Sequence, residues 1–294
     1  MKPQPAFDWG RVTDAVELEL QQSLQLPEAA PGFADWQHLS ALVAAVAQVS
    51  DVRIVAVSGS QGSGKSSLAR CLKDTLCNAG KRAAAVSLDD FYLTRQERLQ
   101  LAQQVHPLLQ TRGVPGTHDW QWLQEVVDAV HKGPARLTLP RFDKGIDDRA
   151  GTCQVETDLL VLEGWCLGIH AQSAAALEHP CNTLERSEDR DGVWRRWVNE
   201  QIHAHYEHLW SSVDLWVHLR VPGFAQVQAW RAQQEQQLPV DQRMSEQQIS
   251  RFIAHYERLT LALWQQMPAT PGFVLQLDEN HQVTQVTTSL ASVK

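Results

Sequence analysis

The strongest constraint on the fold comes from one short stretch, residues 53–68. It opens with the apolar, mostly β-branched residues 54–57, which predict a buried β-strand. Residues 59–66 then match G-x-x-x-x-G-K-[ST], the phosphate-binding loop motif. Helical periodicity follows from Ser67 to Leu76. Because this motif works between a strand and a helix, the order strand, loop, helix favours a real phosphate site over a chance glycine-rich turn.

The residue types in this loop suit a nucleoside triphosphate with Mg²⁺. Its glycines let backbone N–H groups point inward, and the new helix adds the positive end of its dipole. Lys65 can reach the β- and γ-phosphates, and the Ser66 hydroxyl can bind Mg²⁺. We therefore expect ATP to be bound by Gly59, Ser60, Gln61, Gly62, Ser63, Gly64, Lys65, Ser66 and Ser67.

Strands and helices alternate along the rest of the chain. Further strands are predicted at residues 83–88, 136–139, 158–162, 213–219 and 273–277. This alternation predicts an α/β fold with a mostly parallel sheet covered by helices on both faces. Residues 1–50 contain two predicted packing helices, 11–26 and 34–49, and residues 51–294 are expected to form the main domain.

Several chemically useful residues follow predicted strands. The phosphate loop, Asp89, Arg141 and Glu163 each come just past a strand end, so they should meet at one edge of the sheet. Asp89 is the candidate acceptor of a substrate hydroxyl proton, and its neighbour Asp90 is the competitor. Adjacent residues on an extended chain point to opposite sides, so only one should face the phosphates. Glu163 is the candidate carboxylate for Mg²⁺.

Basic residues are placed in the loops around these positions. Arg112, Arg141, Lys144 and Arg149 would suit a small anionic substrate such as a carboxylate. Arg231 lies on a predicted helix within residues 222–245, a segment that could form a lid over the nucleotide. An arginine there could reach the transferred phosphate.

Composition limits the partners and the compartment. The formal net charge of −8 argues against nucleic-acid or anionic-membrane binding. The five cysteines have no C-x-x-C spacing, and an odd number favours reduced thiols in the cytoplasm. The first residues lack an apolar signal-peptide core, and the apolar run at residues 41–47 is too short to cross a bilayer.

Taken together, several sequence blocks resemble the D-glycerate 3-kinases. The blocks are the phosphate loop, residues 86–92 (Val-Ser-Leu-Asp-Asp-Phe-Tyr), 112–119 (Arg-Gly-Val-Pro-Gly-Thr-His-Asp), 140–144 (Pro-Arg-Phe-Asp-Lys), 162–168 (Leu-Glu-Gly-Trp-Cys-Leu-Gly) and 230–231 (Trp-Arg). That family is related to pantothenate kinase, uridine kinase and phosphoribulokinase, which are P-loop kinases. The resemblance covers residues 50–280. Two departures are Gly145, where the family commonly has Ser, and residues 170–192, which match no motif.

The resemblance implies ATP- and Mg²⁺-dependent phosphorylation of the 3-hydroxyl of D-glycerate. It also implies a P-loop kinase fold with a five-stranded parallel core and a helical lid. Asp89 occupies the place of the aspartate that accepts the hydroxyl proton in the uridine kinase relatives. With Asp89, the expected catalytic residues are Lys65, Glu163 and Arg231. The expected substrate residues are Asp90, Tyr92, Arg112, His118, Asp119, Arg141, Lys144, Arg149 and Trp165.

The sequence leaves other functions open. The acceptor could be pantothenate or a nucleoside, although those substrates need a larger pocket with apolar walls. The protein could also be an ATP-binding regulatory module without transfer activity, since a fold does not determine a function. A nucleic-acid kinase is a weaker alternative because it would need a basic groove.

Overall fold

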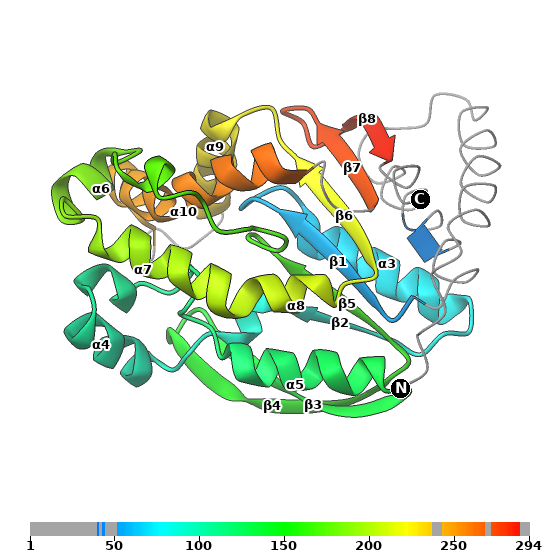
Figure 1. Ribbon diagram of the computed structural model, residues 1–294. Coiled ribbons are helices and arrows are strands. Elements are labelled where there is room, and N and C mark those ends of the chain that lie inside the picture. The colour runs from blue at the N-terminus through cyan, green and yellow to red at the C-terminus, as the bar shows by residue number, and fades with distance from the viewer. Residues whose placement is uncertain (1–39, 41–42, 45–51, 237–242, 268–271, 289–294) are drawn as a thin grey trace.

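A computed structural model gives the fold, and it describes residues 40, 43–44, 52–236, 243–267 and 272–288. Its centre is a six-stranded sheet in the order β2-β5-β1-β6-β7-β8 (Figure 1). The strands are β1 Ile54–Gly59, β2 Ala83–Ser87, β5 Leu159–Gly164, β6 Leu215–Arg220, β7 Gly272–Leu277 and β8 Val283–Thr288. Strands β2, β5, β1, β6 and β7 run parallel, and β8 pairs antiparallel with β7. The expected five parallel strands are confirmed, and β8 is an edge strand that the sequence did not predict.

Helices cover both faces of this sheet. The helices of the described residues are α3 Lys65–Asn78, α4 Arg95–Gln104, α5 Trp120–His131, α6 Thr183–Glu188, α7 Val193–Gln201, α8 Glu207–Ser211, α9 Phe224–Gln236 and α10 Glu246–Gln266. Strand β1 is buried along its whole length and shows why two cores form. Val55 and Val57 join the core beneath α3 and α9, whereas Ile54 and Ala56 join the core beneath α5, α7 and α8.

A second, two-stranded sheet lies outside the main one. Strands β3 (Ala135–Asp143) and β4 (Asp148–Thr157) form an antiparallel hairpin. The prediction that residues 136–139 belong to the main sheet was therefore wrong, and β4 was not predicted. The burial pattern explains the error, because Leu137 and Leu139 are buried while Arg136 and Thr138 are exposed. One buried face suits an outlying hairpin and not a strand covered on both sides.

The helix after residue 192 contains a wider turn. Between α7 and α8, residues Ile202–Tyr206 form a π-helical turn that places one extra residue in the helix. Ile202 and Tyr206 are both fully buried there. The sequence pattern from Trp194 to Trp210 predicts one continuous helix. The structure has that helix, but the wider turn rotates its later side chains around the axis.

The polar, irregular composition of residues 170–192 predicts a surface excursion. Most of these residues are exposed or half-buried, as expected, but the segment is not wholly irregular. They include a 3₁₀ turn at Ala175–Leu177 and helix α6. Buried Glu185 forms a double contact with Arg258 of α10, with Nε–Oε1 2.7 Å and Nη2–Oε2 2.6 Å. Burial of Leu177 and Leu184 completes the attachment of this segment.

Most of the predicted N-terminal helices, 11–26 and 34–49, lie outside the described residues. Ser40, Val43 and Ala44 are described, and they are helical and buried. Val43 and Ala44 pack into the core shared by α3 and α9. The sequence also predicts a turn near Pro239, which lies outside the described residues.

None of the helices within the described part of the chain has the length and apolar character needed to cross a membrane.

Candidate active site

The phosphate loop joins β1 to α3 at the carboxyl edge of the sheet. Gly62 and Gly64 have φ values of 81° and 88°, a left-handed conformation that favours glycine. Gly64 also precedes the first turn of α3, and no side chain caps that helix end. The first amides of α3 and the positive end of its dipole are therefore directed at a position where an anion can bind.

Buried polar atoms without partners gather around this loop. Ser60 Oγ, Gln61 Oε1, Ser63 Oγ and Glu163 Oε2 are buried and have no hydrogen-bond partner among the described residues. Such atoms are costly in a folded protein unless a ligand or water satisfies them. Ser66 Oγ donates a 2.8 Å hydrogen bond to Glu163 Oε1. A hydroxyl and a carboxylate oxygen side by side fit Mg²⁺, which prefers oxygen ligands.

Asp89 lies at the next strand end, in the 3₁₀ turn Leu88–Phe91 that follows β2. Its Oδ1 accepts a 2.8 Å hydrogen bond from the Tyr92 hydroxyl, and its Oδ2 pairs with Lys144 Nζ at 2.5 Å. Burial raises the pKa of Asp89, but the charges of Lys144 and Lys65 outweigh it and hold the pKa at about 2. The carboxylate is therefore ionised at neutral pH and lies within the electrostatic reach of the phosphate-loop lysine.

Asp90 is turned to a different neighbour. Its Oδ1 accepts a 3.2 Å hydrogen bond from the Phe142 amide, and its Oδ2 lies 3.7 Å from Arg141 Nη1. Arg141 belongs to β3 and does not follow a strand of the main sheet. Asp90 and Arg141 therefore fasten the turn that carries Asp89 to the hairpin.

Two other predicted substrate residues are held by protein contacts. Asp119 caps α5 by accepting a 3.1 Å hydrogen bond from the Trp122 amide, and its other oxygen pairs with Arg149 at 2.8 Å. The Arg149 guanidinium also donates to the Tyr92 carbonyl at 3.0 Å and lies 5.5 Å from the Trp122 ring. These contacts give Asp119 and Arg149 a positioning role around Tyr92.

The loop at residues 112–119 is tied down from two sides. Trp165 Nε1 donates to the Gly113 carbonyl at 3.0 Å, and the Tyr256 hydroxyl donates to the Arg112 carbonyl at 3.1 Å. The Arg112 guanidinium pairs with Asp147 in the turn of the hairpin. Trp165 is buried, so it supports the loop from beneath.

Arg98 is a member of this cluster that the sequence did not indicate. It is 1% exposed although it lies on a mostly polar helix, α4. Its guanidinium donates to the carbonyl oxygens of Leu93, Gln110 and Asp147 and lies 3.0 Å from Asp147 Oδ1. One buried arginine thus joins α4, the loop and the hairpin turn, and a mixed polar sequence gives no signal of it.

His118 lies at the end of the same loop and is 1% exposed. Its ring stacks on Tyr92, with a centroid distance of 4.7 Å and an interplanar angle of 19°. Its Nδ1 lies 2.9 Å from the Tyr206 hydroxyl, which comes from the π-helical turn. Burial lowers the pKa of His118 to about 4, so the ring is neutral at physiological pH. Tyr206 was not predicted as a site residue.

A clamp holds the outer side of the phosphate loop, and the sequence missed it too. His281 Nε2 lies 2.7 Å from the Gly62 carbonyl oxygen. The His281 ring stacks on Trp230 of α9 at 3.9 Å, and Trp230 Nε1 donates to the Glu279 carbonyl at 3.1 Å. A Cβ on Gly62 would lie 2.7 Å from Trp230 Cβ, so these groups are in close contact. We call His281 and Trp230 the loop clamp.

Arg231, the predicted lid arginine, follows Trp230 on α9. Its Nη2 pairs with Glu235 at 2.5 Å, and its guanidinium lies 5.2 Å from the Phe252 ring. Its Nε is buried and has no hydrogen-bond partner among the described residues.

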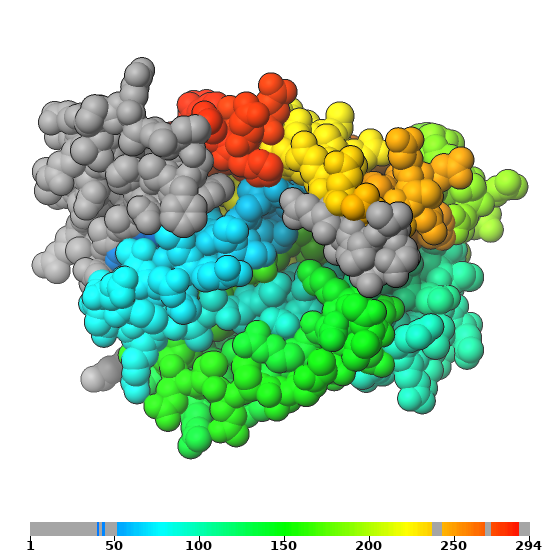
Figure 2. All heavy atoms as spheres, turned by 180° about the vertical axis from the view of Figure 1, so that it is seen from behind, coloured from blue at the N-terminus to red at the C-terminus, as the bar shows by residue number. Residues whose placement is uncertain are grey.

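The phosphate loop and the hairpin face the same side of the molecule. Figure 2 shows α3 (cyan) and the hairpin residues (green) together on the side opposite to the view of Figure 1. This agrees with the contacts of the 3₁₀ turn Leu88–Phe91 with β3 and of Asp89 with Lys144. The site is therefore built from the sheet edge on one side and from the hairpin on the other.

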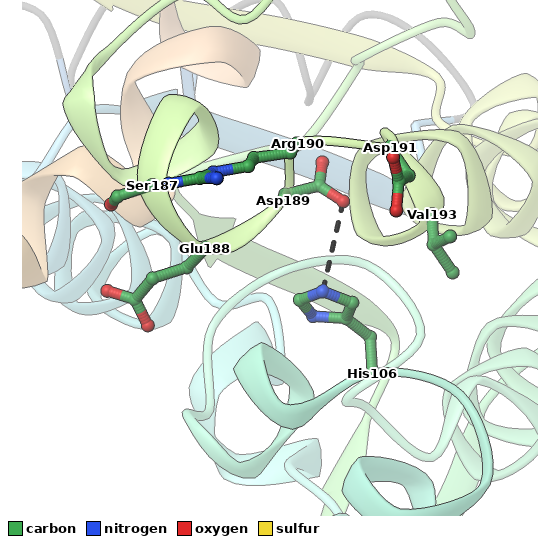
Figure 3. Close-up of a pocket in the computed structure, with 7 residues that line it drawn as sticks. All are labelled: His106, Ser187, Glu188, Asp189, Arg190, Asp191 and Val193. Carbon is green, nitrogen blue, oxygen red and sulfur yellow. Dashed lines mark ion pairs between the residues drawn. The ribbon is translucent and has the colours of Figure 1, made fainter.

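A separate cavity of about 250 Å³ lies away from these residues (Figure 3). Its lining residues are His106, Ser187, Glu188, Asp189, Arg190, Asp191 and Val193. Two of its carboxylates already have protein partners. Asp189 accepts from the Trp194 amide at 2.8 Å and pairs with Arg195, and Glu188 pairs with Arg251. We assign no function to this cavity.

Known proteins similar to this chain include several kinases. No protein-family model matches it. The uncharacterized kinase mug58 of Schizosaccharomyces pombe is 34% identical over 218 residues, which cover 69% of this chain and 78% of that protein. The probable ATP-dependent kinase TDA10 of Saccharomyces cerevisiae is 33% identical, covering 68% and 73% of the two chains.

A plant enzyme and a solved structure carry the name of one family. The chloroplastic D-glycerate 3-kinase of Arabidopsis thaliana is 29% identical over 69% of this chain and 46% of that protein. The structure of a D-glycerate 3-kinase from Cryptococcus neoformans is 23% identical, has a TM-score of 0.67, and covers 95% of this chain and 98% of that chain. At that identity the structure supports the fold alone. Together with the phosphate loop and the parallel sheet, these findings show that the chain is an ATP-dependent P-loop kinase of the D-glycerate 3-kinase family.

Proposed function

We propose that this kinase transfers the γ-phosphoryl group of ATP to the 3-hydroxyl of D-glycerate, giving 3-phosphoglycerate and ADP. The observation that carries the proposal is Asp89, an ionised and partly buried carboxylate between the phosphate-loop lysine and the basic hairpin. The name of the Arabidopsis relative supports the choice of D-glycerate. The odd number of cysteines, five, and the absence of C-x-x-C spacing favour a reducing compartment such as the cytoplasm.

The residues of the chain divide the work between the two substrates. The loop amides and Lys65 would hold the phosphates, and the Ser66 hydroxyl and Glu163 would hold Mg²⁺. When bound, Mg²⁺ neutralises charge on the phosphate oxygens. Arg231, on the proposed lid, would contribute its unpartnered Nε to the transferred group. Loose phosphoryl-transfer transition states depend mainly on such positioning and charge.

Asp89 would orient the acceptor and take its proton. The 3-hydroxyl oxygen forms a bond to the γ-phosphorus while the bond from that phosphorus to the β–γ bridging oxygen breaks, and the hydroxyl proton passes to the Asp89 carboxylate. Lys144, which is 60% exposed, is the cation best able to leave Asp89 and meet the carboxylate of the substrate. Arg112 is the less suitable cation for the substrate carboxylate, because its guanidinium is already paired with Asp147.

An assay of ADP release with D-glycerate tests this proposal. Asp89→Asn should lower turnover by about 10²- to 10⁴-fold, the usual contribution of a positioned acid or base, while ATP binding remains. Asp90→Asn is the matched control, because it changes the neighbouring carboxylate that contacts Phe142 and Arg141. Equal losses in both variants would contradict the role of Asp89. Turnover with pantothenate or a nucleoside but not with D-glycerate would refute the substrate, and no turnover with any acceptor would favour an ATP-binding regulatory module.

A further inference from the structure

The loop at residues 112–119 leaves one side-chain polar atom unsatisfied. The buried hydroxyl of Thr117 in this loop is satisfied, because it donates to the Val114 carbonyl at 2.7 Å and accepts from the Gly113 amide at 3.1 Å. His118 Nε2, by contrast, is buried and has no hydrogen-bond partner among the described residues. Leaving such a nitrogen unpaired costs free energy, so its position calls for an explanation.

The contacts of Tyr206 favour one of the two His118 nitrogens as the carrier of the hydrogen. The Tyr206 hydroxyl oxygen accepts a 2.9 Å hydrogen bond from the Gly116 amide. Burial raises the pKa of Tyr206, so the hydroxyl keeps its own hydrogen. His118 Nδ1 lies within hydrogen-bond distance of that hydroxyl, at 2.9 Å, so we take Nδ1 as the acceptor of its hydrogen. In a neutral imidazole the hydrogen is therefore on Nε2.

The surroundings of His118 connect it to the reacting end of the site. Its ring stacks on Tyr92, whose hydroxyl donates to Asp89 Oδ1 at 2.8 Å. The Asp89 charge also acts on His118, since it opposes the effect of burial on the histidine pKa. His118 thus lies one ring away from the proposed proton acceptor.

We propose that Tyr206 holds His118 as the Nε2–H tautomer, and that this neutral donor binds an oxygen atom of the small hydroxy acid. Tyr206 is then a positioning residue, and His118 is a specificity-determining contact. A neutral donor can recognise a hydroxyl or carboxylate oxygen without adding charge beside Lys144 and Lys65. The assignment of the ligand class rests on the proposed function, whereas the tautomer does not.

The tautomer is tested on the ligand-free, full-length protein labelled with ¹⁵N-histidine. The His118 signals are identified by their loss in His118→Gln, and ¹H–¹⁵N NMR at about pH 6 should show a neutral ring protonated at Nε2. Tyr206→Phe should release the single tautomer into a mixture. Tyr256→Phe is the matched control, since it removes another tyrosine hydroxyl that donates a hydrogen bond to the same loop. This variant should leave the His118 signals unchanged. A ring protonated at Nδ1, or a charged ring, would overturn the proposal.

Kinetics test the contact with the acceptor. His118→Leu should raise the KM for D-glycerate about tenfold or more, equivalent to about 1.4 kcal/mol, with little change in the KM for ATP. His118→Gln keeps a side-chain N–H at a similar reach and should recover much of the loss. Equal losses in the two variants, or an equal rise in the KM for ATP, would show that His118 only supports the loop.

These two experiments separate the failure of the inference from the failure of the proposed function. If the wild-type protein does not phosphorylate D-glycerate, the proposed substrate is wrong, but the NMR measurement still decides the tautomer. The same two His118 variants are then compared with whichever acceptor supports ADP release. Loss of acceptor binding that His118→Gln restores supports the contact, and any other pattern overturns it.

Discussion

The loop clamp makes a prediction about ATP affinity. His281 contributes a 2.7 Å contact with the Gly62 carbonyl and a ring stacked on Trp230. A neutral hydrogen bond contributes about 0.5–1.5 kcal/mol, and an aromatic pair contributes about 0.5–1.5 kcal/mol. His281→Ala should therefore weaken the clamped conformation of the loop by about 1–3 kcal/mol.

The effect on ATP follows from the population of the binding-competent loop. If the released loop samples other conformations, the apparent affinity falls in proportion to the competent fraction. A weakening of about 3 kcal/mol would lower the apparent ATP affinity about 150-fold, and a weakening near the middle of the range would lower it roughly tenfold to thirtyfold. We expect the Kd for Mg²⁺–ATP to rise about tenfold, measured by isothermal titration calorimetry with a non-hydrolysable ATP analogue. The KM for D-glycerate should change much less.

Two variants serve as controls for this prediction. His281→Gln keeps an N–H donor but loses the stack, so its ATP affinity should be intermediate. His131 makes a similar contact, from Nε2 to the Ser212 carbonyl at 2.6 Å, but Ser212 precedes β6 and so lies at the opposite edge of the sheet. His131→Ala should lower stability without changing ATP affinity. The reasoning is refuted if His281→Ala lowers the stability as expected but leaves ATP affinity unchanged.

Three further predictions concern the acceptor side and the metal. Lys144→Met removes a positive charge that favours the ionised carboxylate of Asp89, so the pKa of Asp89 should rise from about 2. The acid limb of the kcat/KM profile should then move to higher pH. An acid limb that stays in place or moves to lower pH would contradict this. Arg98→Met leaves Asp147 and buried carbonyl oxygens without a partner, so it should lower the free energy of unfolding in urea by about 3–5 kcal/mol. A loss below about 1 kcal/mol would argue against the role of Arg98 in joining α4, the loop and the hairpin turn. Glu163→Gln should raise the Mg²⁺ concentration for half-maximal turnover about tenfold, and an unchanged value would remove Glu163 from the metal site.

The sequence predicts the phosphate loop and the central strands well because their signals are local. A fixed spacing of glycines, lysine and serine identifies the loop, and short apolar runs identify β1, β5 and β6. Asp119 directly precedes the helical periodicity of residues 120–131, which predicts the capping role that the structure shows, since a cap needs only the adjacent helix. Features encoded within about ten residues can be read without knowing the tertiary contacts.

The remaining parts depend on residues far apart in the chain. Asp89 contacts Lys144 across 55 positions, and His281 contacts Gly62 across 219 positions. Arg149 looks like a free loop cation in the sequence, but the structure places it in β4 and pairs it with Asp119. A basic residue that anchors a loop and one that binds a substrate have the same sequence signal, so only the fold separates them.

The π-helical turn before Tyr206 has a geometric consequence for the direction of its hydroxyl. In an ordinary helix each residue advances the side chain by about 100° around the axis, as 3.6 residues complete a turn. Deleting one residue within 202–205 would leave a regular helix of nearly the same length but would rotate Tyr206 by about that angle. Its oxygen would then face another part of the interior, and Gly116 and His118 would both lose it. The one extra residue in this turn therefore determines the direction in which the Tyr206 side chain points.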